Sequence, residues 1–191
     1  MSYFLNLAFA LVIFLIISPI SASIFIYLSI VIGHPIIFKQ KRSGLNGRKF
    51  DLYKFRTMTI LKKKNEIKRI LKSTVFLRIS RLDELPQLIN IIKGDLNFIG
   101  PRPLLPEYDK LYTKEQKKRL SIKPGITGWA QVNGDNNISW KKKFQLDLWY
   151  VKNRTILLDL KIIFLTFLFF VKIGLKKNNN KLITKKFNGK N

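Results

Sequence analysis

The amino-acid sequence predicts a membrane-associated α/β protein, with apolar helices at both ends of the chain and a small mixed domain with short strands between them. Three observations predict this fold class. Residues 3–32 contain no charged side chain, the middle of the chain mixes turn signals with β-prone and helical stretches, and residues 155–175 form a second, interrupted apolar stretch. We expect four parts: a membrane helix at 1–35, a globular domain at 36–153, an amphipathic membrane-associated helix at 154–176 and a basic flexible tail at 177–191.

The charge of the chain is strongly positive. It has 36 Lys+Arg against 11 Asp+Glu, a net charge of +25, which indicates a polyanionic partner such as nucleic acid, an anionic membrane surface or a phosphorylated substrate. No RNP-like, zinc-finger or helix-turn-helix signature occurs, and the membrane segment argues against nucleic acid, so we expect no nucleic-acid partner. The absence of cysteine and the single histidine exclude disulfides, thiolate zinc sites and multi-histidine metal sites.

The N-terminal apolar segment is long enough to meet a membrane. As a helix, residues 3–32 would extend about 45 Å, more than a hydrocarbon core requires. The segment lacks the basic start and the cleavage pattern of a signal peptide, so we expect it to be retained. Ser18-Pro19 lies inside it, where proline kinks a helix and a serine hydroxyl can satisfy a freed backbone group. A kink leaves two topologies open: a spanning helix, which the residues alone favour, and a re-entrant one.

The globular part begins with a predicted hairpin. Turn signals at Ser43-Gly44 and Asn46-Gly47 precede β-prone residues, so a loop or hairpin should feed a strand. Lys54 and Arg56 point to the same side of such a strand. Further along, residues 85–92 have helical spacing and Gly94 is placed to end the helix.

The second apolar stretch differs from the first because Asp159, Lys161 and Lys172 interrupt it. Its uncharged part is about ten residues long, too short to span a bilayer, so we expect an amphipathic helix that lies in the interface. The basic, low-complexity residues that follow predict a flexible tail attracted to anionic membrane lipids.

Two adjacent carboxylates, Asp83 and Glu84, stand out in this basic chain. Pro86 belongs in the first turn of a helix, which would place Asp83 near the N-cap and Glu84 at the first helical position. Asp83 could therefore be a helix cap, or the two acids could be a reaction centre at a helix start that favours phosphate.

Basic residues around the pair favour the second interpretation. Arg78 lies just upstream, Arg102 is held between two prolines in "GPRP", and Lys54 and Arg56 are further candidates for substrate binding. Together they indicate a phosphoryl-transfer site with room for Mg²⁺, in which a carboxylate can act as the nucleophile.

Three long motifs resemble one family. "HPIIFKQKRSGLNGRKFDLYKFRTM", "RLDELPQLINIIKGDLNFIGPRP" and "KPGITGWAQVNG" occur in the order and at the spacings of the bacterial sugar transferases, the monotopic phosphoglycosyl transferases. The resemblance covers roughly residues 3–165. It implies transfer of a phospho-sugar from a UDP-sugar to undecaprenyl phosphate, with release of UMP, as the first membrane step of glycoconjugate biosynthesis. It leaves the sugar open.

The resemblance also implies roles for individual residues. Asp83 matches the nucleophile that holds the phospho-sugar covalently, and Glu84 matches the partner acid associated with Mg²⁺. The basic positions that bind phosphates or nucleotide are matched by Lys54, Arg78 and Arg102. Ser18-Pro19 matches the helix break of a re-entrant membrane helix, which reverses the topology preference and places the active site on the cytoplasmic face of the bacterial inner membrane.

The sequence departs from the family pattern at two places. Asp135 follows "WAQVNG" where arginine is common, and Lys141 and Lys142 stand where acids are common. These exchanges concern substrate contacts of the Gly-rich loop and leave "LDELPQ" and "GPRP" intact. The alternatives are a catalytically impaired relative and a non-catalytic membrane-surface protein that binds anionic lipid, which would not depend on the Asp83 carboxylate.

Overall fold

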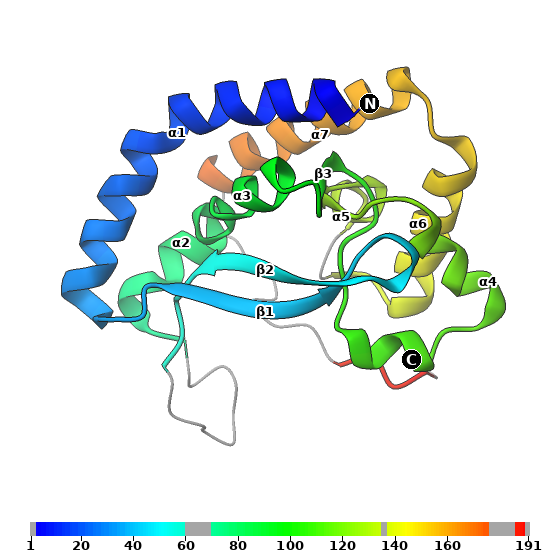
Figure 1. The fold of residues 1–191 in the computed structure, drawn as a ribbon, viewed down its shortest axis with the longest axis horizontal. Coiled ribbons are helices and arrows are strands. Elements are labelled where there is room, and N and C mark those ends of the chain that lie inside the picture. The colour runs from blue at the N-terminus through cyan, green and yellow to red at the C-terminus, as the bar shows by residue number, and fades with distance from the viewer. Residues whose placement is uncertain (1–2, 60–69, 135–136, 176–185, 190–191) are drawn as a thin grey trace.

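The computed structural model describes residues 3–59, 70–134, 137–175 and 186–189, and forms a small mixed α/β domain with one long apolar helix at its N-terminus (Figure 1). The small mixed α/β domain with short strands and the long apolar N-terminal helix agree with the predicted fold class. The strands are β1 (Ile37–Ser43), β2 (Lys49–Phe55), β3 (Asn97–Ile99) and β4 (Gly125–Thr127). The helices are α1 (Tyr3–Ile32), α2 (Val75–Ile79), α3 (Gln87–Ile92), α4 (Lys114–Lys117), α5 (Trp129–Val132), α6 (Trp140–Asn153) and α7 (Ile156–Leu175).

Helix α1 continues through Pro19 and is visibly bent along its length (Figure 1). Proline has no N–H, so the carbonyl of Leu15, four residues earlier, loses its helical partner. The hydroxyl of Ser18 donates to that carbonyl at 2.9 Å, and the hydroxyl of Ser23 donates to the carbonyl of Pro19 at 2.9 Å. The expected kink and the expected role of the serine hydroxyl are therefore both present.

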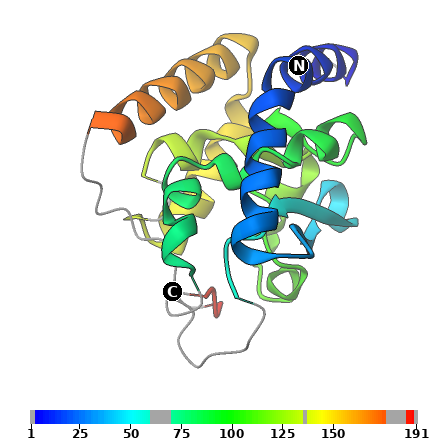
Figure 2. The same ribbon diagram turned by 90° about the vertical axis from the view of Figure 1, so that its left-hand side faces the viewer.

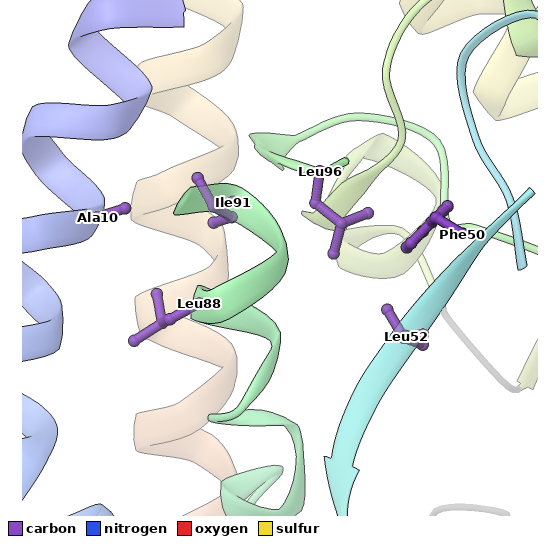
Figure 3. Packing of buried hydrophobic residues seen from close by; sticks show 6 residues of the cluster. All are labelled: Ala10, Phe50, Leu52, Leu88, Ile91 and Leu96. Carbon is purple, nitrogen blue, oxygen red and sulfur yellow. The ribbon is translucent and has the colours of Figure 1, made fainter. Parts of the chain in front are cut away.

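Both arms of α1 pack against the domain. Ala10, in the N-terminal arm, faces α3 and joins the largest apolar cluster (Figure 3), whose buried members are Ala10, Phe50, Leu52, Leu88, Ile91 and Leu96. Ile24 and Leu28, in the second arm, pack in a separate cluster with Ile36, Phe55 and Leu77. The rest of α1 is largely uncovered, and by length and composition residues 6–32 could cross a membrane.

The predicted hairpin is present. Strands β1 and β2 pair antiparallel, with Phe38 opposite Lys54 and Arg42 opposite Phe50. The turn between them uses left-handed backbone at Asn46 (φ 52°) and Gly47 (φ 78°), as the Asn-Gly signal indicates. Because side chains alternate along a strand, Arg42 and Lys54 project from the same face of the hairpin as the buried residues Phe50 and Leu52.

A second, parallel pair of short strands, β3 and β4, carries the loop that follows Ile99. The two backbones approach so closely that a Cβ added at Gly125 would lie 2.1 Å from the amide nitrogen of Gly100. Glycine is therefore required for this contact, which joins the segment before Arg102 to the "KPGITG" segment.

Helix α7 begins at Ile156 and exposes most of its apolar residues. Ile156, Leu157 and Phe167 are more than half exposed, whereas Ile162 is fully buried. Both views place α7 and the N-terminal arm of α1 along the same edge of the molecule (Figures 1 and 2). One side of the protein therefore presents two largely uncovered apolar helices.

The C-terminal residues that the structure describes lie against the domain. Phe187 is buried and packs edge-on against Tyr108 and Phe144, with ring centroids 5.6 Å and 5.0 Å away. The remainder of the expected tail, residues 177–185 and 190–191, lies outside the described residues.

Candidate active site

Asp83 and Glu84 lie on a separate 3₁₀ turn, Leu82–Glu84, before the helix that they were expected to start. The expected N-cap position of Asp83 is therefore wrong: α3 begins at Gln87 and Pro86 precedes it without a side-chain cap. The backbone bonds here span three residues, Glu84 N–H to the carbonyl of Arg81 at 3.0 Å and Leu88 N–H to that of Leu85 at 3.1 Å. Since α3 has only six residues, positive charge at this site comes from side chains and not from a helix dipole.

Glu84 is the centre of a buried ion cluster. Its Oε1 atom accepts hydrogen bonds from Lys54 Nζ at 2.7 Å and from Arg102 Nη2 at 2.9 Å, and Arg81 Nη1 lies 3.6 Å away. These residues come from β2, the "GPRP" loop and the residue before the 3₁₀ turn. The cluster thus brings together Lys54, Glu84 and Arg102, three of the residues singled out in the sequence.

This arrangement keeps Glu84 ionised. Burial alone would raise the pKa of Glu84, but the charges of Arg102, Lys54 and Arg81 outweigh it and hold the pKa well below its usual range. Burial lowers the pKa of Lys54, and the opposite charge of Glu84 offsets this only in part. Glu84 therefore serves as the counter-ion of the cations around it.

Asp83 has the opposite electrostatic environment. Its side chain is also buried, and burial raises its pKa, to which the neighbouring charge of Glu84 adds. Lys54, Arg78 and Arg81 oppose this shift without cancelling it. Two adjacent carboxyl groups are thus driven apart in pKa, a pattern that divides roles between acids in catalytic sites.

The other two predicted substrate-binding arginines differ in placement. Arg78 donates to the hydroxyl of Thr57 at 3.1 Å, and its charge lowers the pKa of Asp83, so it lies near the acid pair. Arg56 instead donates to the carbonyls of Ile32 and Gly33, both at 2.6 Å, at the end of α1. No described contact joins Arg56 to the acids, and its guanidinium stabilises the last carbonyls of α1.

Sequence reasoning missed Arg42, which lies beside Arg102. Burial, and then the charge of Arg102, lower the pKa of Arg42 to about 10. Its position on the same hairpin face as Lys54 is visible in the strand alternation, and that signal could have identified it. Of the two family departures, Lys141 and Lys142 are exposed on α6, and Asp135 lies outside the described residues.

The oxygen atoms of Asp83 and Glu84 are of the type that Mg²⁺ prefers. Among the described residues there is no group of three or more acidic, histidine or cysteine side chains that could hold a metal ion. The donor set therefore suits an ion bound by one or two carboxylates together with substrate phosphates, the common magnesium arrangement, and does not suit an all-protein cage.

Comparison with known proteins gives one family and several relatives. The family model described as bacterial sugar transferase matches residues 1–173. A Bacillus subtilis (strain 168) protein named uncharacterized sugar transferase EpsL is 55% identical over 141 residues, which cover 71% of this chain and 69% of that protein.

Two relatives carry more specific names. The UDP-glucose:undecaprenyl-phosphate glucose-1-phosphate transferase of Escherichia coli (strain K12) is 34% identical over 84% of this chain and 38% of its own length. The undecaprenyl-phosphate galactose phosphotransferase of Salmonella typhimurium is 35% identical over 86% of this chain and 40% of its own length. The chain thus spans about two fifths of these two relatives. The family match covers most of its length, and the chain belongs to the bacterial sugar transferase family.

Proposed function

We propose that this chain transfers a sugar-1-phosphate from a UDP-sugar to undecaprenyl phosphate and releases UMP. Its family membership and the names of its relatives support this activity. The observation that carries the proposal is the difference in charge environment between the adjacent acids. Glu84 is neutralised by Lys54 and Arg102, whereas the carboxyl of Asp83 has a raised pKa and makes no ion pair of that kind in the described contacts.

Asp83 is the nucleophile in this proposal. Its carboxylate oxygen attacks the phosphorus atom that carries the sugar, a bond forms between Asp83 and that phosphorus, and the bond to the departing UMP oxygen breaks. A phosphate oxygen of undecaprenyl phosphate then attacks the same phosphorus, and the Asp83 carboxylate leaves. A carboxylate whose pKa is raised is a stronger nucleophile than an ordinary one, and the covalent step lets two unlike substrates use one site in turn.

The surrounding cations bind and orient the diphosphate. Arg102 combines its bond to Glu84 with a side chain that is one-third exposed, so its guanidinium can also reach a substrate phosphate. Arg78 and Arg81 lie close enough to lower the pKa of Asp83 and would place positive charge beside the reacting phosphorus. Lys54 holds Glu84 in position through its hydrogen bond to Oε1.

We further propose that Asp83 and Glu84 hold Mg²⁺ together with the substrate phosphates. Oε1 of Glu84 already accepts hydrogen bonds from two cations, so its second oxygen and the Asp83 carboxylate are the ligands that the protein would offer. When bound, the ion would supply positive charge that stabilises the departing UMP.

The membrane position of the site is also a proposal. Ala10 and Leu28, in opposite arms of α1, both contact the domain, which supports a re-entrant helix whose two ends stay on one side of the membrane. The exposed apolar residues of α7 on the same edge would enter the interface, and basic residues would attract anionic lipid. The active site would then face the cytoplasm, where the acceptor head group and the UDP-sugar can meet.

The test is UMP release by purified protein supplied with Mg²⁺, undecaprenyl phosphate and a panel of UDP-sugars, beside the Asp83→Asn variant. We expect release that requires the lipid acceptor, with a loss of at least about 1000-fold in the variant because the nucleophile is removed. Equal release by both proteins would remove Asp83 from the mechanism. Lipid binding by both proteins without release by either would favour the non-catalytic membrane-surface protein.

A further inference from the structure

The loop that carries Arg102 is anchored through its carbonyl groups. Pro101 and Pro103 have no N–H, so this stretch can be held mainly by accepting hydrogen bonds. Four consecutive carbonyls, those of residues 101–104, each accept one. The donors, in order, are the Gly125 amide at 3.0 Å, Arg119 Nη2 at 2.6 Å, Arg42 Nη1 at 3.5 Å and the Ser43 amide at 3.0 Å.

The donor to the Arg102 carbonyl belongs to a buried ion pair. Arg119 donates to Oδ2 of Asp147 through Nε at 3.1 Å and Nη2 at 2.8 Å, and both side chains are at least 95% buried. Arg119 also lies 3.4 Å from the Tyr112 hydroxyl, and its guanidinium is flanked by the rings of Tyr112 and Phe144. Nη2 of Arg119 is therefore shared between the carboxylate of α6 and the backbone of the active-site loop.

A contribution to stability does not by itself explain why a buried ion pair such as Arg119–Asp147 is present. Removing two charges from water offsets most of their attraction, and apolar residues of similar volume often serve as well or better. A guanidinium does provide a rigid, planar set of donors, and the Asp147 carboxylate fixes the direction in which this one points. The Arg119 guanidinium points toward the carbonyl of Arg102, and the side chain of Arg102 in turn reaches Glu84.

We propose that Arg119, oriented by Asp147, is a positioning residue that sets the Arg102 guanidinium against Glu84 and the donor phosphate. This inference uses the proposed function for its kinetic test. Arg119 touches neither the acids nor, in this role, the substrate: it acts through the backbone of Arg102.

The test removes the pair without leaving an orphan charge, in the double variant Arg119→Met/Asp147→Leu. We expect it to fold with nearly unchanged thermal stability and to lose about 10- to 100-fold in kcat/KM, because Arg102 is misplaced. In an Arg102→Ala background the same double substitution should cause no further loss, since its effect runs through Arg102. Wild-type kcat/KM in the double variant, or an equal loss in both backgrounds, would overturn the proposal.

A matched control uses one residue of the same helix, α6, and one residue of α7. Tyr150 of α6 donates to Oδ1 of Asp159 of α7 at 2.6 Å, and both residues are buried. Tyr150 packs in one cluster with Ile99, whereas the carbonyls of residues 101–104 accept hydrogen bonds from other donors. Tyr150→Phe/Asp159→Asn should leave kcat/KM within about twofold and give the same small change in both backgrounds. A loss that matches the Arg119→Met/Asp147→Leu loss would make the effect a general consequence of disturbing α6 and would overturn the assignment.

A second readout does not depend on catalysis. The chain has no cysteine, so Arg102→Cys gives a single thiol on the loop. We expect maleimide to react with it at least about fivefold faster when Arg119→Met/Asp147→Leu is added, because the loop opens more often, and not when the Tyr150/Asp159 control is added. An unchanged rate would overturn the positioning role even if the parent protein releases UMP. A faster rate, together with no UMP release by the parent protein, would defeat the proposed function and not the anchoring of the loop.

Discussion

Lys54 donates a hydrogen bond to Glu84 across 2.7 Å, although the two residues come from different elements and both side chains are largely buried. The pair is part of a cluster in which one carboxylate compensates several cations, so the two members are not equivalent. Removing Glu84 would leave Lys54 and Arg102 without their shared counter-ion in a largely buried site.

Glu84→Gln should therefore lower the free energy of unfolding by about 3–5 kcal/mol, the effect of breaking a buried ion pair by removing one partner. Denaturant unfolding in detergent measures it. Asp51→Asn is the matched control, because Asp51 pairs with Lys41 at 2.9 Å on the exposed face of the hairpin, and such pairs contribute about 0–1 kcal/mol. Equal effects of the two substitutions would contradict the central position of Glu84.

Asp83→Asn should raise the free energy of unfolding, whereas Glu84→Gln lowers it. The folded pKa of Asp83 is raised above the ordinary value of 3.8, so above that folded pKa its charged form destabilises the fold, and the effect is relieved as the pH falls through it. The variant should accordingly unfold at higher denaturant concentration than the parent, and the difference should grow as the pH rises from 3.8. Unfolding curves over a pH series, with divalent ions chelated, measure this.

For Glu84→Gln, the stability difference from the parent should depend on pH for the opposite reason. Since the folded pKa of Glu84 is depressed below 4.5, its contribution is present above 4.5 and is lost as the pH falls through the folded pKa. The stability difference between parent and Glu84→Gln should shrink at low pH. A difference that does not change with pH for either variant would show that the two carboxyl groups are not separated in pKa.

Substitutions of Arg56 and of Arg102 should affect different properties, stability in the first case and activity in the second. Arg102 contacts Glu84, whereas Arg56 donates to the carbonyls of Ile32 and Gly33. Arg102→Ala should therefore lower kcat/KM by about 100-fold in the protein that remains folded, and Arg56→Ala should lower the melting temperature with little change in kcat/KM for the protein that remains folded. Kinetics and thermal unfolding on both variants test this. A specific loss of kcat/KM in folded Arg56→Ala protein would instead support Arg56 as a substrate-binding residue.

The bend of α1 should determine its topology. Pro19→Leu restores the backbone donor and favours a straight helix long enough to span the bilayer. In intact cells, a Ser2→Cys thiol should be protected from a membrane-impermeant reagent added outside, and should become reactive when Pro19→Leu is added. Labelling of Ser2→Cys from outside with Pro19 present would refute the re-entrant proposal.

The sequence predicted the features that depend on local chemistry. The Asn-Gly turn, the kink at Pro19 and its compensation by Ser18 follow from backbone donors and from left-handed backbone conformations, which neighbouring residues determine. The meeting of Lys54, Glu84 and Arg102 was expected from the motifs as a set. The distances that make Glu84 their common acceptor were not.

Other features depend on tertiary contacts and could not be predicted from the sequence. Spacing alone did not reveal that Asp83 and Glu84 form a 3₁₀ turn before α3, because Pro86 fits either arrangement. Arg119 and Asp147 are 28 residues apart, and nothing in their local sequence indicates that they meet. For Arg56, strand alternation gives the side of the hairpin but not the partner, which is the end of α1, and its role in substrate binding stays a prediction.

The most direct test of the account is to trap the phospho-sugar on Asp83. Purified protein is incubated with Mg²⁺ and UDP-glucose, the donor named for the Escherichia coli relative, and with other UDP-sugars, each carrying ³²P in the phosphate next to the sugar, without acceptor. We expect label on the protein that undecaprenyl phosphate removes and that maps to Asp83. It should persist in the Tyr150→Phe/Asp159→Asn control but not in Asp83→Asn. Acceptor-dependent UMP release without labelled protein, or label retained by Asp83→Asn, would contradict this expectation.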